Sequence, residues 1–67
     1  MDRAIRIILK FLIDNPDGGS ISHIREAIAS NRKSCLIIVN YCDKQGYVFR
    51  NGDTRTIGDS GKKYLTS

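Results

Sequence analysis

Gly46 divides the chain into two parts with different periodicities, and this change limits the folds that the chain can adopt. Before Gly46, apolar residues recur at the three- and four-residue spacing of amphipathic helices. After it, the β-forming stretch Tyr47–Arg50 precedes Asn51-Gly52, a strong signal for a tight hairpin, and Thr54–Ile57 is expected to form the returning strand. The pattern predicts helices followed by a β-hairpin, in which Asp53 belongs either to the turn region or to a longer loop.

The first helix is predicted from about Arg3 to Asp14. Asp2 is a suitable N-cap, because its carboxylate can accept a hydrogen bond from a backbone N–H of the first turn. The run from Asn15 to Gly19 ends the helix, because it combines proline and glycine. Four apolar residues of this helix follow the spacing i, i+3, i+4 and i+7 that gives one buried face: Ile5, Ile8, Leu9 and Leu12.

Two more helices are expected before Gly46. Ser20 or Ser22 is placed to cap a short second helix, which ends near Ser30. The third helix is predicted from about Asn31 to Gln45, because Gly46 directly after it supplies the residue type that most often ends a helix.

A last short helix is expected after the hairpin, with Asp59 or Ser60 as its cap. The predicted fold class is α+β: a three-helix core, then a β-hairpin, then a short C-terminal helix. We expect a single domain over residues 1–67, because a chain of 67 residues can hold only one compact core.

The composition is that of an ordinary globular chain, with 40% hydrophobic and 27% charged residues. No apolar run approaches the roughly 20 residues of a membrane span, and the start of the sequence lacks a signal-peptide pattern. We therefore expect a cytoplasmic, nucleoid-associated protein that does not enter a membrane.

The chain carries a formal charge of +4, from eleven Lys and Arg against seven Asp and Glu. On so small a body this excess favours a polyanionic partner. The alternative is that a modest positive charge only keeps the domain soluble. The positions of the charged residues must decide between a polyanionic partner and solubility alone.

Several stretches resemble bacterial and archaeal winged-helix transcription regulators. Ile21–Ile28 looks like their second helix, Cys42–Val48 looks like their junction from recognition helix to wing, and Ile57–Leu65 resembles the segment that follows the wing in MarR-like families. The span from Ile8 to Gly46 also resembles the small fimbrial-operon regulators of the PapI and FaeA type. The resemblance implies a winged helix-turn-helix fold and sequence-specific binding of double-stranded DNA, as expected of a small prokaryotic, phage, plasmid or archaeal-virus transcription regulator.

The third helix has two opposite faces. One is an apolar stripe that we expect to face the first two helices: Cys35, Ile38, Val39 and Cys42. The other is a candidate for the major groove, because lysine, asparagine and isoleucine can contact guanine, adenine and the thymine methyl group: Lys33, Ile37, Asn40 and Lys44. The alternative is that these four residues are simply the solvent-facing side of an amphipathic helix.

The beginning of the third helix groups four polar residues, Asn31, Arg32, Lys33 and Ser34. Recognition helices place such N-terminal residues against base edges and phosphates, so we expect DNA contacts here. Three apolar residues, Leu36, Ile37 and Tyr41, leave more apolar surface on the flanks than DNA reading needs. They pack either under the wing or against a second subunit.

The hairpin places Arg50 and Arg55 on either side of Asn51-Gly52. We expect Arg50, Asn51 and Arg55 to contact the minor groove or the backbone, where arginine is favoured. The alternative is an exposed hairpin whose charges only aid solubility.

Enzymatic activity is not expected, because the single His23 has no nucleophile or motif-spaced carboxylate beside it, and no cofactor or metal set occurs. Cys35 and Cys42 lie seven residues apart in one helix, roughly 10 Å, which is too far for a disulfide. The main rival to DNA binding is a winged helix that serves as a protein-interaction module or assembly adaptor. A homodimer or a partner regulator is compatible with either function.

Overall fold

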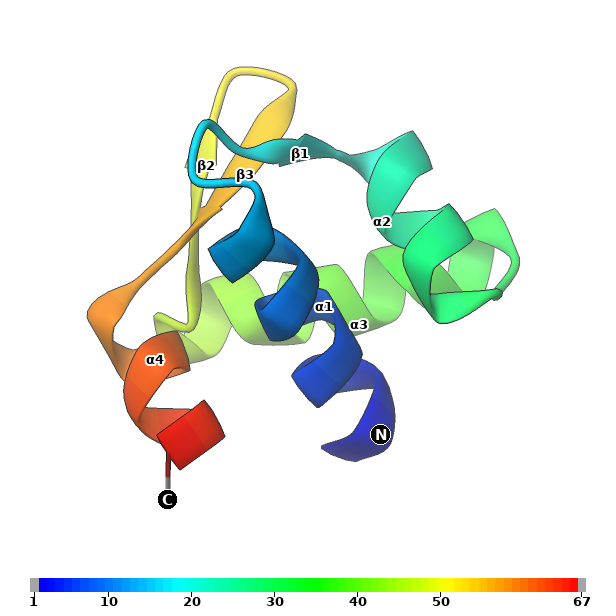
Figure 1. The fold of residues 1–67 in the computed structure, drawn as a ribbon. Helices are drawn as coiled ribbons and strands as arrows, with labels where there is room; N and C mark the ends of the chain where they lie inside the picture. The colour runs from blue at the N-terminus through cyan, green and yellow to red at the C-terminus, as the bar shows by residue number, and fades with distance from the viewer. Residues whose placement is uncertain (1, 67) are drawn as a thin grey trace.

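The computed structural model describes residues 2–66, and these form four helices and a three-stranded antiparallel sheet (Figure 1). The elements follow one another as α1 Asp2–Asp14, β1 Gly19–Ser20, α2 Ile21–Ile28, α3 Arg32–Gln45, β2 Val48–Asn51, β3 Thr54–Ile57 and α4 Asp59–Thr66. This order confirms the predicted α+β architecture of a helical core, a hairpin and a short final helix. The short strand β1 was not predicted from the sequence.

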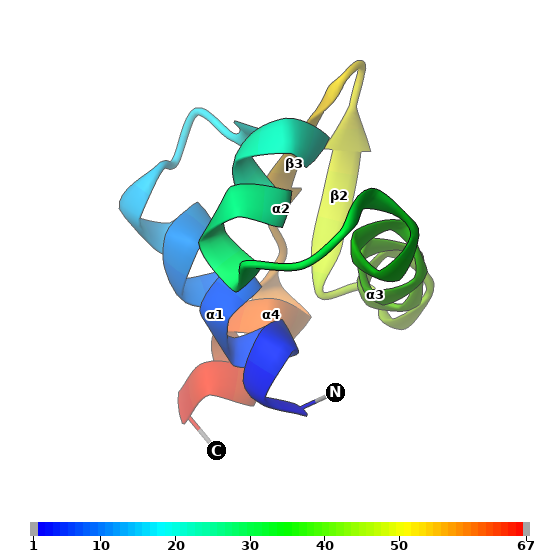
Figure 2. The ribbon, with the colours of Figure 1, turned by 90° about the vertical axis from the view of Figure 1, so that its right-hand side faces the viewer.

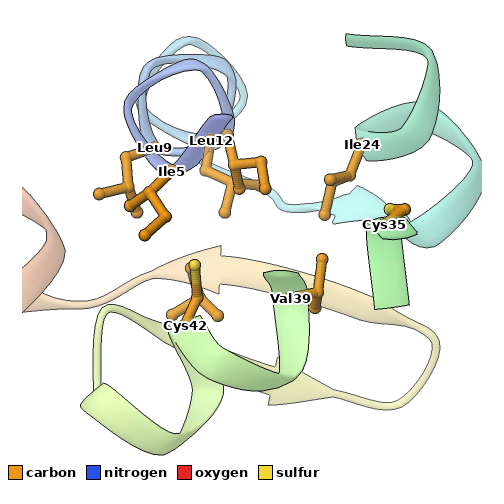
Figure 3. Packing of buried hydrophobic residues seen from close by; sticks show 9 residues of the cluster. Ile5, Leu9, Leu12, Ile24, Cys35, Val39 and Cys42 are labelled. Carbon is orange, nitrogen blue, oxygen red and sulfur yellow. The ribbon is translucent and has the colours of Figure 1, made fainter. Parts of the chain in front are cut away.

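The core lies between α1, α2 and α3, whose apolar faces point into one shared space (Figure 3). The predicted stripe of α1 is confirmed, since its four apolar residues are all buried. The predicted stripe of α3 is also confirmed, although Ile38 is only partly buried at the edge of the core. The buried hydrophobic residues are Ile5, Ile8, Leu9, Leu12, Ile24, Cys35, Val39, Cys42 and Val48.

Local hydrogen bonds fix the ends of the helices. Of the two candidate caps for α2, Ser20 has this role: its Oγ accepts a hydrogen bond from the backbone N–H of His23 at 3.2 Å. Gly46 ends α3 in the left-handed region at φ 76°, as predicted, and its N–H donates to the carbonyl of Asp43. The next N–H, of Tyr47, donates to the carbonyl of Cys42 at 3.0 Å. This arrangement turns the chain sharply from α3 into the hairpin.

The hairpin turn lies one residue later than the sequence predicted. Asn51 pairs with Thr54, so the two loop residues are Gly52 and Asp53 rather than Asn51 and Gly52. Gly52 has a positive φ of 64°, as hairpin turns with glycine at their first central position require. The Thr54 hydroxyl also donates to the carbonyl of Asn51 at 2.8 Å, which closes the turn around this register.

The sheet has the order β1-β3-β2, so β3 is its central strand. The short β1 pairs with β3 immediately before α2 begins, with Gly19 opposite Arg55 and Ser20 opposite Thr54. The start of α2 is thereby tied to the hairpin. The hairpin begins directly after α3, whereas α2 begins near the turn of the hairpin, because β1 pairs with Thr54 and Arg55 (Figure 2).

Candidate nucleic-acid interface

The helix α3 lies at the right-hand edge of the molecule in Figure 2, and the hairpin of β2 and β3 and the helices α1, α2 and α4 all lie to its left. We call the hairpin, residues 48–57, the wing. Burial of one face of α3 in the core leaves the opposite face in solvent. Each of the four residues of the predicted outer stripe is exposed: Lys33, Ile37, Asn40 and Lys44. Their arrangement is the one predicted, while DNA contact by them stays a prediction.

The first turn of α3 carries two exposed cations, Arg32 and Lys33, and no acidic residue. The N-terminus of a helix is its positive end, where cations cost of the order of 0.3–1 kcal/mol each and anions are favoured. The helices α1 and α4 follow this rule, since each begins with an aspartate. The charges at the start of α3 therefore oppose helix stability and suit a bound anion.

Asn31 and Ser34 have a structural role at the same helix end. The Oδ1 of Asn31 accepts a hydrogen bond from the backbone N–H of Ser34 at 2.8 Å, which makes Asn31 the N-cap of α3. Ser34 is half-buried, whereas Asn31 is exposed. The amide NH2 group of Asn31 can contact DNA while its Oδ1 keeps the hydrogen bond to the helix.

A hollow of about 300 Å³ lies between the starts of α2 and α3. It is lined by Ile21, Ser22, Arg25 and Arg32, so its lining residues include two arginines and no acidic residue. Arg25 was not among the site residues predicted from the sequence. Arg25 follows Ser22 by three residues, so the two side chains share one face of α2. This spacing could have identified Arg25 as a neighbour of the start of the helix.

A groove of about 420 Å³ separates α3 from the wing. It brings together Asn40 and Arg50, which the sequence predicted as contacts from different elements. Both residues are exposed, and the Nε of Arg50 donates to the carbonyl of Gly52 at 3.3 Å, which holds the arginine near the tip of the wing. Asn51 is exposed beside it.

Arg55 is not an exposed wing residue, unlike Arg50 and Asn51, and the DNA contact expected of it stays a prediction. Arg55 is only 7% exposed, and its Nε donates to Oδ1 and Oδ2 of Asp43 at 3.2 and 3.3 Å. The cause is the strand order: Arg55 belongs to the central strand, between β1 and β2, whereas its cross-strand neighbour Arg50 belongs to an edge strand. Because no sequence pattern predicted β1, the same DNA contact was expected of both arginines.

The two cysteines are buried free thiols, as predicted for core residues. Burial raises the pKa of Cys42 to about 11, with a further increase from the carboxylate of Asp43. Burial also raises the pKa of Cys35, against an opposing effect of the Arg25 charge. Both thiols are therefore protonated near neutral pH, which suits packing and not nucleophilic chemistry. Among residues 2–66, no three His, Cys, Asp or Glu side chains are grouped so that they could hold a metal ion.

Comparison with protein families decides what kind of domain this surface belongs to. The family model described as "Elongation factor SelB, winged helix" matches residues 10–57, which run from α1 to the end of the wing. The chain belongs to the SelB winged-helix family. The match to this family contains α2, α3 and the whole wing, and therefore every residue of the candidate interface. No curated protein and no solved structure matches the chain.

Membership in the SelB winged-helix family confirms the winged helix but not the narrower resemblance to MarR-like and PapI-like regulators, because the family is named for an elongation factor. Winged-helix domains bind nucleic acids or proteins, and fold alone does not choose between them. No helix within residues 2–66 has the length and apolar character to span a bilayer.

The capping role of Asn31 can be separated from any role in binding. We predict that Asn31→Ala lowers the free energy of unfolding by about 1 kcal/mol, because the N–H of Ser34 loses its acceptor. Asn31→Asp should keep the stability of the parent protein, because aspartate supplies an equivalent acceptor. Urea unfolding followed by circular dichroism measures both. An alanine variant as stable as the parent would show that the cap contributes nothing.

Proposed function

We propose that this protein binds double-stranded DNA sequence-specifically, as a small transcription regulator. In this proposal α3 enters the major groove, and the wing contacts the adjacent minor groove or backbone. The observation that carries the proposal is the unopposed positive charge at the start of α3, where two exposed cations stand at the positive end of the helix. Such a placement is unfavourable for folding and favourable for binding a polyanion.

Base reading is assigned to the exposed stripe of α3. Asn40 can make two hydrogen bonds to adenine, and Ile37, which is 56% exposed, can contact a thymine methyl group. Lys33, nearer the start of the helix, can approach guanine or a phosphate. The stripe is continuous along α3 because the buried residues occupy the opposite face.

Phosphate contacts are assigned to the cations around this stripe. Arg25 and Arg32 share the hollow between α2 and α3, and no ion pair involves either of them among residues 2–66. On the other side of the stripe, Arg50 stands at the groove between α3 and the wing. A duplex lying on α3 would place one backbone strand near each of these two positions, because the backbone borders the major groove on both sides.

A protein partner is the second candidate function, and three exposed apolar residues favour it. Ile37, Tyr41 and Phe49 are 56%, 38% and 58% exposed, and they extend from α3 to the wing. Aromatic and aliphatic side chains in this amount suit a protein interface. Leu36, which the sequence grouped with Ile37 and Tyr41, is half-buried and lines the groove between α3 and the wing.

The salt dependence of duplex binding tests the proposed function. With about five phosphate contacts, the slope of log K against log salt should be near −4.5, which weakens binding roughly 500-fold between about 50 and about 200 mM salt. An RNA stem of the same length is the matched control. It should bind much more weakly, since the narrow, deep major groove of A-form RNA excludes a helix.

Fluorescence anisotropy with labelled duplexes gives these values directly. Absence of duplex binding at low salt would contradict the proposal and leave the protein-partner function. Tighter binding of the RNA stem would contradict the assignment of DNA as the polyanion.

Two substitutions on the exposed stripe distinguish base reading from phosphate contact. We predict that Asn40→Ala reduces discrimination between a selected site and random duplex by about 5- to 150-fold, with little change in affinity for random duplex. Lys33→Ala should weaken binding to both duplexes by a similar factor. Sites would first be selected from a random pool and then compared by titration. Equal losses on all duplexes for Asn40→Ala would remove it as a base reader.

A further inference from the structure

The ion pair between Asp43 and Arg55 connects the two elements of the candidate interface. Asp43 lies near the end of α3 and Arg55 lies on the central strand β3, with Nε to Oδ1 at 3.2 Å. Both carboxylate oxygens accept from the same Nε. The ion pair between Arg6 and Asp2, by contrast, joins two residues of a single helix.

The surroundings of the Asp43–Arg55 pair make it more than a surface contact. The side chains of Arg55 and Asp43 are 8% and 29% exposed, against 41% and 65% for Arg6 and Asp2. Exposed pairs contribute little, because solvent screens them and both side chains lose conformational freedom. A partly buried charge that loses its partner is costly, so the wing is constrained to keep Arg55 within reach of Asp43.

The ion pair also reduces the repulsion between two arginines of the wing. Arg55 lies directly opposite Arg50 in the β2–β3 register, and like charges in opposite positions repel. The carboxylate of Asp43 compensates the charge of Arg55, which leaves Arg50 as the exposed cation of this cross-strand pair. Arg55, Arg50 and Asn40 line the same groove. Arg55, held by Asp43, therefore borders the same groove as the two residues that we expect to contact DNA from different elements.

We propose that Asp43 and Arg55 are positioning residues, which hold the wing at a fixed orientation to α3. With the wing fixed, Arg50 and Asn40 can contact one duplex at the same time, and the ordering of the wing is complete before DNA binds. The part of this inference that concerns DNA rests on the proposed function, whereas the fixed orientation is a property of the free protein.

The first test measures the wing in the free protein. In Asp43→Asn, the backbone order parameters of residues 50–54 should fall from about 0.85 to below about 0.6, while those of α1 stay unchanged. Asp2→Asn is the matched control, because it removes the exposed ion pair of α1 and should leave the wing rigid. Asp43→Glu, which keeps the charge, should restore part of the order. An equally rigid wing in Asp43→Asn would overturn the proposal.

The second test measures coupling on DNA, under conditions where circular dichroism shows each variant to be folded. Arg50→Ala should weaken duplex binding about fivefold in the parent protein but less than twofold in Asp43→Asn, because a mobile wing no longer presents Arg50. Lys33→Ala, at the other end of α3, should cost the same factor in both backgrounds. Equal losses from Arg50→Ala in both backgrounds would overturn the positioning role.

A replacement variant and a separate readout distinguish failure of this inference from failure of the proposed function. If Asp43→Asn does not fold, Arg55→Lys replaces it in both tests, since lysine keeps the charge but lacks the Nε–H donor of the guanidinium that bonds the carboxylate. If the parent protein binds no duplex, the proposed function fails, and the order parameters of the wing alone decide whether the pair fixes it.

Discussion

Burial of one face of α3 against α1 and α2 is the interaction on which the rest of the structure depends. Val39 and the two cysteines of α3 are almost completely inaccessible, and they meet the apolar stripe of α1 and Ile24 of α2 (Figure 3). Because the side chains of a helix are fixed relative to one another, burying this face determines which residues face solvent. The outer stripe of lysine, isoleucine and asparagine is thus a consequence of the core.

The wing depends on α3 in turn. Gly46 ends the helix in a left-handed conformation and directs the chain into β2, while Asp43, in the last turn of the helix, holds the central strand through Arg55. The short strand β1 completes the sheet and fixes the start of α2 beside it. Three segments distant in sequence therefore surround one groove, and the cations at the starts of α2 and α3 border a second hollow.

The fold was predictable because local signals and the core agree. The helical spacing of Ile5, Ile8, Leu9 and Leu12 predicted the buried face of α1, and Gly46 predicted the end of α3. The same reasoning did not predict β1, since two residues are too few to give an alternating pattern. The turn at Gly52 and Asp53 was displaced by one residue, because register depends on the pairing of Asn51 with Thr54.

The candidate site was predictable on α3 and less so elsewhere. Residues that share one helix face follow from spacing alone, whereas the burial of Arg55 and the approach of Arg25 to Arg32 depend on contacts between elements. The narrow resemblance to MarR-like and PapI-like regulators came from short stretches at the helix and wing junctions. Such stretches identify a winged helix but not its family, which the match to the SelB winged helix supplied.

The central claim is that the outer face of α3 and the wing form the DNA-binding surface. Amide chemical shifts of the labelled protein, followed during titration with a selected duplex, test this most directly. The account predicts that the largest changes occur in residues 31–44, in residues 50–54 and around Arg25, while α4 and the first half of α1 change little. Changes centred on α1 and α4, with α3 and the wing unaffected, would contradict it.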